Sequence, residues 1–441
     1  MAAAGTESNR ARVVVLGGGF AGASCAQALE RAGRRQVDVT IINRNNYFVF
    51  TPLLVEAGTG SLEPRHAVVP LRDFLTTSTL RTAEVVGHDP AARRVTYRMV
   101  GEENLSSMPY DHLVVALGSV TRLPPVPGLS EYGFEMKSLG DAVALRDRAI
   151  ALLEQADAVA DPQRRRELLH FVVVGANFSG VEVAGEFFEF LREAARRYAT
   201  VQAKECTVTL VEIAPRILSA LDEDLSDYGL RQLRRCGVRV ELETSVSEVA
   251  PDSVLLSTGE RLPTRTLIWC AGIAPNPLAA RLGLPCDERG AIICEPDLRV
   301  QGFDNVWAIG DCAANPTPEG GNYPATAQHA VRQGKHLARN ILRTVRGQPP
   351  LPSRIRSLGA LAALGCRTAV AKVFGINLAG FPAWFLWRSV YLLKMPGWSR
   401  RLRVALDWTM DLLFSRTIVQ LGVHRTVPRD AERSKTGGIL E

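Results

Sequence analysis

Along this chain, apolar runs typical of β-strands alternate with apolar positions at helical spacing, and this order occurs twice. Residues 12–16 and 37–43 form β-branched apolar runs, and residues 20–32 between them carry apolar side chains at helical spacing. The same order returns about 158 residues later, with a strand, a helix and a strand expected at residues 171–174, 181–199 and 207–212. A switch between strand and helix periods of this kind predicts two βαβ units in an α/β chain.

The turn of the first unit is rich in glycine. Gly17, Gly19 and Gly22 are spaced G-x-G-x-x-G between the strand and the helix. In a dinucleotide site these glycines allow a tight turn, close approach of a pyrophosphate and close packing of helix on strand. Asn43 ends the second strand in place of the usual carboxylate, and its amide would bind ribose hydroxyls more weakly. The alternative is a Rossmann turn with a purely structural role.

The second unit has a modified loop. Gly175 and Gly180 are kept, but Asn177 occupies the middle position. Asparagine is frequent at positive φ, so we expect the turn to survive with Asn177 in a left-handed conformation. Glu212 ends the following strand, where a carboxylate accepts from the ribose 2′-hydroxyl and repels a 2′-phosphate. The second unit therefore predicts binding of NAD rather than NADP.

Two such units predict two dinucleotides, a tightly held FAD at the first loop and an exchanging NADH at the second. Two more apolar strands end in a small residue and glycine, at Gly118 and Gly272, as in a ribbon that crosses between nucleotide domains. A third strand ends at Gly310 and Asp311. Asp311 could hydrogen-bond a flavin ribityl hydroxyl, and an ordinary turn is the alternative.

Composition narrows the class of protein. The 441 residues include 46% hydrophobic and 22% charged residues, as in a globular protein of two or three domains. The net charge of +6 comes with no nucleic-acid motif, so no nucleic-acid partner is expected. The eight cysteines show no C-x-x-C or C-x4-C spacing, which indicates a reduced protein without a metal site. The first 12 residues are too short and polar for a signal segment, and no run predicts a transmembrane helix.

The composition changes from Ser357 onward. Residues 358–380 are apolar with glycine breaks and predict a short hairpin. Two later stretches hold four of the six tryptophans, and Arg403, Asp407 and Asp411 would form one polar stripe on an apolar helix. Tryptophan, arginine and a large apolar face predict a helix lying in a membrane surface, and a dimer interface or core helix is the alternative. The last dozen or so residues are polar, and we expect them to be disordered.

In the order of these elements, the chain over residues 12–422 resembles the two-dinucleotide-binding flavoproteins, and within them the type II NADH:quinone oxidoreductases, which do not pump protons. The most specific segments are NYFVFTPLL at 46–54 and AQHAVRQ at 327–333. The departures are Asn43, Asn177 and Leu117. The resemblance implies two Rossmann-like domains with a C-terminal membrane-surface region. The expected division is residues 1–125 and 285–350 for FAD, 126–284 for NADH, and 351–441 for the membrane-associating region.

The resemblance also implies roles for single residues. It places Thr51 and Pro52 against the flavin ring, Glu182 near the nicotinamide in the first turn of its helix, and Ala327 at the FAD. Glu186, one turn further, is expected to be a solvated or packing residue. The quinone is expected near Gln328 and Gln333, which lie on different faces of a helix capped by Thr326 and ending near Val345.

The partners implied are a membrane quinone and the membrane surface, at the cytoplasmic face of the inner membrane, and a homodimer is left open. A sulfide or disulfide oxidoreductase would need a cysteine pair beside the flavin, for which Cys312 and Cys366 are the remaining candidates. A redox-sensing flavoprotein with slow turnover is a further alternative.

Overall fold

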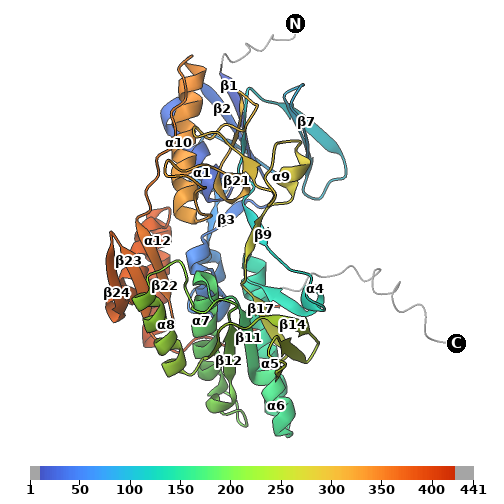
Figure 1. Cartoon of the computed structure of the whole chain (residues 1–441), viewed down its shortest axis with the longest axis vertical. Coiled ribbons are helices and arrows are strands. Elements are labelled where there is room, and N and C mark those ends of the chain that lie inside the picture. The colour runs from blue at the N-terminus through green and yellow to red at the C-terminus, as the bar shows by residue number, and fades with distance from the viewer. Residues whose placement is uncertain (1–9, 423–441) are drawn as a thin grey trace, which may run out of the picture.

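The computed structural model describes residues 10–422 (Figure 1). The expectations for residues 1–9 and for the polar end of the chain from residue 423 therefore lie outside the described residues. In Figure 1 the chain forms an upper part that contains β1, β2, α1 and α10, and a lower part that contains α5, α7, β11 and β12.

The upper part is built on a seven-stranded sheet. Its strand order is β20 (Val306–Ala308), β8 (His112–Val115), β1 (Ala11–Leu16), β2 (Val37–Asn43), β5 (Thr79–Asp89), β6 (Arg94–Met99) and β7 (Leu105–Pro109). The strands from β20 to β5 are parallel, whereas β6 and β7 are antiparallel to their neighbours. Helices α1 (Phe20–Gly33) and α10 (Ala327–Val345) pack so closely that a side chain on Gly334 would overlap the carbonyl of Ala21. The sheet therefore combines strands from both ends of the chain.

The lower part is built on a five-stranded parallel sheet. Its strand order is β10 (Gly133–Glu135), β17 (Thr266–Trp269), β11 (His170–Val174), β12 (Thr207–Val211) and β13 (Arg239–Glu241). The helices of this part are α5 (Leu139–Ala158), α6 (Pro162–Leu169), α7 (Phe178–Ala195) and α8 (Glu223–Cys236), and a small antiparallel sheet joins β14 (Val246–Val249), β15 (Ser253–Leu256) and β16 (Arg261–Pro263). Valine and isoleucine fill the central strands because both faces of a parallel sheet are covered.

The two parts are linked by an antiparallel ribbon of β9 (Ser119–Thr121) and β18 (Ile273–Pro275). Gly118 and Gly272 precede these strands with φ values of +68° and +78°, which confirms the predicted crossover.

The remaining elements are short. They are β3 (Tyr47–Val49), η1 (Thr51–Leu53), α2 (Leu54–Thr59), η2 (Pro64–Ala67), β4 (Val68–Pro70), α3 (Leu71–Phe74), α4 (Leu129–Tyr132), η3 (Ala203–Glu205), α9 (Leu278–Arg281), β19 (Ile292–Ile293), η4 (Gly310–Cys312) and β21 (Ala313–Ala314).

The C-terminal region, residues 358–417, lies beside α7 and α8 in Figure 1, coloured orange to red. It contains an antiparallel meander of β22 (Gly359–Ala363), β23 (Ala369–Val373) and β24 (Ile376–Gly380), followed by α11 (Phe381–Lys394) and α12 (Trp398–Leu413). Trp387 and Trp408 belong to the hydrophobic core of the upper part, whereas Ala362 and Val370 belong to that of the lower part. The region therefore completes both cores.

Candidate active site

The first glycine loop has the geometry of a phosphate-binding turn. Gly17 has φ of +100°, and a side chain on Gly22 would overlap the Gly17 carbonyl. A Cβ atom built on Gly19 meets no other atom within 4 Å, so the space before the loop is open. The first turn of α1 carries no acidic residue, and its N-cap makes no side-chain hydrogen bond. Free N–H groups and open space at this helix end fit a pyrophosphate.

Asn43 binds the glycine loop itself. Its Oδ1 accepts from the backbone N–H of Gly18 at 2.9 Å, and its Nδ2 donates to the carbonyl of Asn45 at 2.7 Å. The neutral amide of Asn43 thus fixes the glycine loop at the end of β2, where the usual residue is a carboxylate.

The second loop repeats this turn with one difference. Gly175 has φ of +96°, and Gly180 packs on the Gly175 carbonyl as Gly22 packs on Gly17. The prediction of a left-handed Asn177 is wrong, because its φ is −75° and its ψ is −174°. The middle position is extended in both loops, since Gly19 has φ of −72°. Asn177 instead caps α7: its Oδ1 accepts from the Gly180 N–H at 3.1 Å, and its Nδ2 donates to the Cys270 carbonyl at 2.7 Å.

Glu212 occupies the place in the second unit that Asn43 occupies in the first. Its carboxylate accepts from the N–H of Ala176, the residue after the first glycine, and from the N–H of Ala214 at 2.8 Å. Nearby, Arg216 donates to the Ser219 carbonyl at 3.2 Å. A carboxylate oxygen can accept more than one hydrogen bond, so Glu212 keeps acceptor capacity for a ribose hydroxyl.

Asp311 lies in η4, at the start of the ribbon between the two parts. Its Oδ2 accepts from Ser119 Oγ at 2.8 Å, and Lys137 Nζ lies 3.0 Å from the same hydroxyl. Burial lowers the pKa of Lys137, and the charge of Asp311 opposes this shift. Ser119 and Lys137 were missed in the sequence, because they come from separate elements without a motif. The three residues form a polar cluster suited to hydroxyl groups.

Glu182 is half-buried and lines a small cavity. The cavity has a volume of about 10 Å³, and its lining includes Pro52, Glu182 and Trp387. Oε1 of Glu182 accepts from the Ala363 N–H at 3.1 Å and from Trp387 Nε1 at 3.2 Å. Burial raises the pKa of Glu182 to about 8. Because α7 begins at Phe178, the expectation that Glu182 lies in the first helical turn is wrong. The helix starts earlier than predicted because Asn177 caps it.

Four glutamates form a stripe along α7, at positions 182, 186, 189 and 193. The C-terminal region contacts every member: Ala363 and Trp387 bind Glu182, Cys366 N–H donates to Glu189 at 3.0 Å, and Arg416 lies 3.6 Å from both Glu186 and Glu193. Glu186 lines both the small cavity and a neighbouring polar cavity of about 280 Å³. Burial raises its pKa to about 7, and Glu186 is partly buried beside Arg416 rather than solvated. The helical spacing of the acids was a visible signal for this stripe.

A second cluster lies beside the small cavity, which Glu56 and Trp384 line. Arg388 lies 3.6 Å from Glu56 and 3.9 Å from Asp411, and stacks over the rings of Trp384 and Trp408. Burial raises the pKa of Glu56, which accepts from Trp408 Nε1 at 2.8 Å. Arg388 and Glu56 were missed because each is a single charge in an otherwise apolar segment.

The predicted glutamines lie on different faces of α10 and bind different partners. Gln333 is buried, and its Oε1 accepts from the Gly310 N–H at 2.8 Å. Gln328 accepts from the Leu358 N–H at 3.2 Å and donates to the Gly359 carbonyl at 3.1 Å. Helix α10 spans Ala327–Val345 with Thr326 as its N-cap, which confirms both predicted ends. The structure therefore brings Gln333 beside Gly310 and Asp311, and Gln328 beside the start of β22.

Most of the C-terminal tryptophans do not face outward. Trp384, Trp387 and Trp408 are buried, whereas Trp398 is 76% exposed. The carboxylates of the expected polar stripe also turn inward: Asp407 accepts from the Glu63 N–H at 3.2 Å, and Asp411 pairs with Arg416. Reading these tryptophans and this stripe as a solvent- or membrane-facing surface is therefore wrong. The outward stripe of α12 is apolar, at Trp398, Leu402, Leu406, Met410 and Leu413.

The cysteine pair proposed for a disulfide oxidoreductase is not assembled. Cys312 is buried in η4, where its Sγ lies 3.5 Å from the Ile309 carbonyl. Cys366 is exposed in the turn between β22 and β23, beside Glu189 of α7. Within residues 10–422, no helix combines the length and the apolar character needed to cross a bilayer.

Comparison with known proteins agrees with this geometry. The model of the pyridine nucleotide-disulphide oxidoreductase family matches residues 11–334, and that of the NDH2 C-terminal domain matches residues 358–417. A probable NADH dehydrogenase of Dictyostelium discoideum is 32% identical over 92% of this chain and 90% of its own length. The type II NADH:quinone oxidoreductase Ndh of Mycobacterium tuberculosis is 31% identical over 92% of this chain and 89% of its own.

A solved structure shares the fold. NDH2 of Plasmodium falciparum, in complex with NADH, matches with a TM-score of 0.86 and 20% identity, over 93% of this chain and all of that one. The two family models cover the nucleotide-binding parts and the C-terminal region separately, and the curated relatives cover them together. The chain therefore belongs to the pyridine nucleotide-disulphide oxidoreductase family, in its type II NADH dehydrogenase branch, as the resemblance predicted.

Proposed function

We propose that this protein is an FAD-dependent NADH:quinone oxidoreductase that transfers electrons without pumping protons. The observation that carries the proposal is the presence of two dinucleotide loops in one chain, joined by the β9–β18 ribbon and followed by the NDH2-type C-terminal region. When bound, FAD supplies the two-electron chemistry between NADH and a quinone. The residues of the chain bind, orient and shield the reactants.

FAD is held by the upper part of the molecule. The loop of Gly17, Gly19 and Gly22 offers free N–H groups to the pyrophosphate, and Asn43 fixes that loop. Asp311 takes a ribityl hydroxyl beside Ser119. The remaining contacts of the flavin come from Thr51, Pro52, Gly118, Gly310 and Ala327. These assignments support a division into FAD-binding residues 1–125 and 285–350, NADH-binding residues 126–284 and a C-terminal region from 351.

NADH is bound by the second loop. Gly175 and Gly180 form the tight turn at the start of α7, where no side chain would fit, Gly272 turns the chain at positive φ into the ribbon, and Glu212 accepts from the adenosine ribose. Asn177 already uses the Gly180 N–H, so this helix end offers fewer donors to phosphate than α1 does. Weaker binding of the pyrophosphate suits a dinucleotide that must leave after each turnover.

Glu182 is the proton-holding residue beside the flavin. Its raised pKa keeps it protonated at neutral pH, and it lines the same cavity as Pro52. Glu186 connects this cavity to the polar one. Since quinone reduction consumes two protons, carboxyl groups that titrate near neutrality are suited to supply them.

The quinone is reduced beside the first turn of α10. Its N-terminus carries no acidic residue, so its partial positive charge can stabilise negative charge on a reduced flavin. Gln333 holds Gly310, and Gln328 fixes the start of β22, so the two glutamines position opposite walls of this site.

The protein acts on quinone from the membrane surface as a peripheral protein. Exposed apolar side chains of α11 and α12, including Phe381, Phe385, Leu402 and Leu406, form the contact surface. The quinone therefore reaches the site from the lipid phase. We assign the contact to the cytoplasmic face of the inner membrane, as the family resemblance implies.

A steady-state assay of NADH oxidation with a lipid-soluble quinone tests the function. We expect turnover of about 1–1,000 per second, the usual range for enzymes, with FAD copurifying. Turnover slower than about one per minute with every quinone would favour the redox-sensing alternative. Sulfide-dependent quinone reduction without NADH would favour the sulfide oxidoreductase.

A further inference from the structure

Two cysteines from distant parts of the sequence meet where the C-terminal region contacts the lower part. Cys236 is the last residue of α8, and Cys366 lies in the turn between β22 and β23, 130 residues later. Both thiols are free, and their side chains hydrogen-bond to each other. The other six cysteines contribute no such pair in the structure.

The turn that carries Cys366 is strained. The Thr368 N–H donates to the Gly365 carbonyl at 3.0 Å, and the two central residues, Cys366 and Arg367, have φ values of +48° and +54°. Asparagine and glycine are the residues preferred at both of these positions, because other side chains crowd the backbone there. A cysteine in this place has a conformational cost, as is common at functional positions.

Neighbouring residues of α7 hold both cysteines. The Cys366 N–H donates to Glu189 Oε2 at 3.0 Å. A Cβ atom on Gly237, the residue after Cys236, would lie 2.8 Å from the ring of Phe188. Since Phe188 and Glu189 are consecutive, the same turn of α7 lies beside the backbone at both cysteines.

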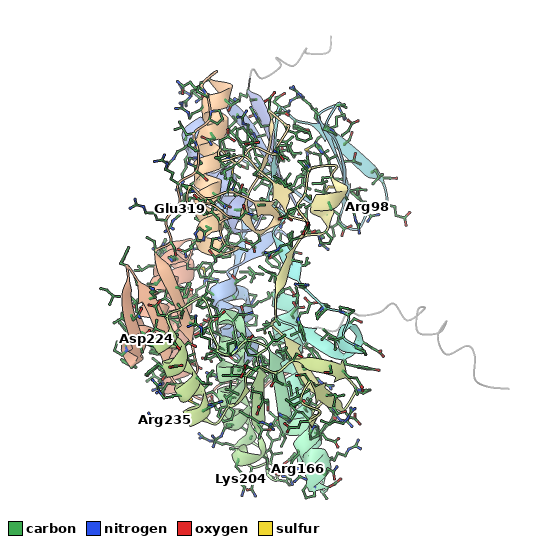
Figure 2. The ribbon with its side chains drawn as sticks, viewed as in Figure 1. Arg98, Arg166, Lys204, Asp224, Arg235 and Glu319 are labelled. Atoms are coloured by element: carbon green, nitrogen blue, oxygen red, sulfur yellow. The ribbon has the colours of Figure 1, made fainter. Side chains whose placement is uncertain are left out.

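The pair also differs from the other cysteines in reactivity. The hydrogen bond between the two thiols lowers the pKa of Cys236 and raises that of Cys366, so the first proton leaves the pair from Cys236, whereas burial raises the pKa of Cys25, Cys206 and Cys270 to about 12. The thiolate is the nucleophilic form. Cys366 is exposed, and Figure 2 shows Arg235, the neighbour of Cys236, at the outer surface. An oxidant can therefore reach the pair from solvent.

We propose that Cys236 and Cys366 are a reversible disulfide site, closed by a hydroperoxide, that ties α8 covalently to the C-terminal region. The Cys236 thiolate attacks the peroxide, an S–O bond forms as the O–O bond breaks, and the leaving oxygen takes a proton. The Cys366 sulfur then attacks this sulfenic acid, forming the S–S bond as water leaves. Two thiols are oxidised, and one hydrogen peroxide is reduced to two water molecules.

The bond would act on the strand beside the candidate active site. Cys366 follows β22 by three residues, and the Ala363 N–H at the end of that strand binds Glu182. A disulfide would fasten this end of β22 to the lower part of the molecule, next to the glutamate stripe of α7.

The test uses the purified full-length, FAD-loaded protein, reduced, desalted and then treated with hydrogen peroxide. We expect the intact mass to fall by about 2 Da, for two lost hydrogen atoms, and to return with dithiothreitol. A non-reducing digest should give one peptide pair that joins Cys236 to Cys366. Cys236→Ser and Cys366→Asn should both abolish it, and asparagine suits the turn, so that variant should fold.

Cys286→Ser is the matched control, because Cys286 is also partly exposed but lies outside the pair, and this variant should keep the cross-link. The proposal is overturned if oxidised wild-type protein shows no loss of mass, only added oxygen on single thiols, or only disulfides between two molecules.

Discussion

Glu182 is a carboxyl group whose surroundings favour its neutral form. Burial beside Ala363 and Trp387 raises its pKa to about 8, well above the value in an unfolded chain. Between the ordinary value and about 8, the unfolded chain loses this proton while the folded chain keeps it. The contribution of Glu182 to the free energy of unfolding therefore falls as pH rises through that window. This behaviour supports the proposed role of Glu182 as a proton donor near the flavin.

The pH dependence of quinone reduction tests this store. We expect the rate at which quinone reoxidises the reduced flavin to fall as pH rises through about 8. Glu182→Gln keeps the acceptor for Ala363 and Trp387 but cannot titrate, so this fall of the rate with pH (the falling limb of the pH profile) should disappear. Stopped-flow absorbance gives the rate. Glu186→Gln is the matched variant, and it should move this fall in rate along the pH axis, because the charge of Glu186 raises the pKa of Glu182.

Ferricyanide, which accepts electrons without protons, should show no such limb in the wild-type protein. The same falling limb in wild type and Glu182→Gln would assign the ionisation to another group.

We propose that Glu212 determines the choice between NADH and NADPH. Its carboxylate lies beside the Ala176 and Ala214 N–H groups, and Arg216 is engaged with Ser219. We expect kcat/KM to be higher for NADH than for NADPH. Glu212→Ala should narrow the ratio by about ten- to a hundredfold, the scale of a lost charge-assisted hydrogen bond and a lost repulsion. Equal values for both donors in the wild-type protein would contradict this assignment.

Helix N-termini are the elements to which we assign most of the contacts with the dinucleotides and the reduced flavin. The first turns of α1, α7 and α10 all lack acidic residues. Side chains cap α7 at Asn177 and α10 at Thr326, whereas the Gly19 N-cap of α1 makes no such bond, so α1 leaves the most donors for a ligand. In our proposal α1 holds FAD firmly, α7 binds an exchanging NADH, and α10 stabilises the edge of the reduced flavin.

The sequence predicted the elements whose signals are local. The strands and glycines of both loops and both ends of α10 follow from period, spacing and the Thr326 cap. The conformation of Asn177 could not be predicted from its frequency at positive φ, because its cap on Gly180 outweighs that tendency. The inward face of α12 depended on partners in distant segments, Glu63 and Arg388, which no local pattern reveals.

Gln328 connects α10 to the C-terminal region. Gln328→Ala removes hydrogen bonds to Leu358 and Gly359, so the wall of the quinone site should loosen. We expect quinone reduction to slow by about ten- to a hundredfold, the scale of two or three lost neutral hydrogen bonds. Flavin reduction by NADH and the rate with ferricyanide should stay near wild type. An equal loss in all three assays would show that Gln328 acts on folding alone.

Helix α12 presents an apolar stripe to the outside. A variant with Leu402, Leu406 and Met410 all changed to glutamine should bind vesicles of anionic phospholipid at least about tenfold more weakly, because apolar burial drives the contact. Leu105→Gln in β7 is the control, since Leu105 is also exposed but lies in the upper sheet. Sedimentation with vesicles gives the bound fraction. Unchanged binding of the triple variant would place the membrane contact elsewhere.

The whole molecule is held together by its C-terminal region. Trp387 and Trp408 complete the core of the upper part, and Ala362 and Val370 complete that of the lower part. The same region supplies the N–H groups and arginines that bind the glutamate stripe of α7. A chain cut before this region would expose two cores and a row of carboxylates, so function has to be tested in the full-length protein.

The most direct test of the central claim is the flavin absorbance of the purified full-length protein under anaerobic conditions. We predict that NADH bleaches the band near about 450 nm, typical of a protein-bound flavin, and that a lipid-soluble quinone then restores it, with one quinol formed per NADH consumed. A protein without flavin, a band that NADH leaves unchanged, or a bleached band that quinone does not restore would contradict the account.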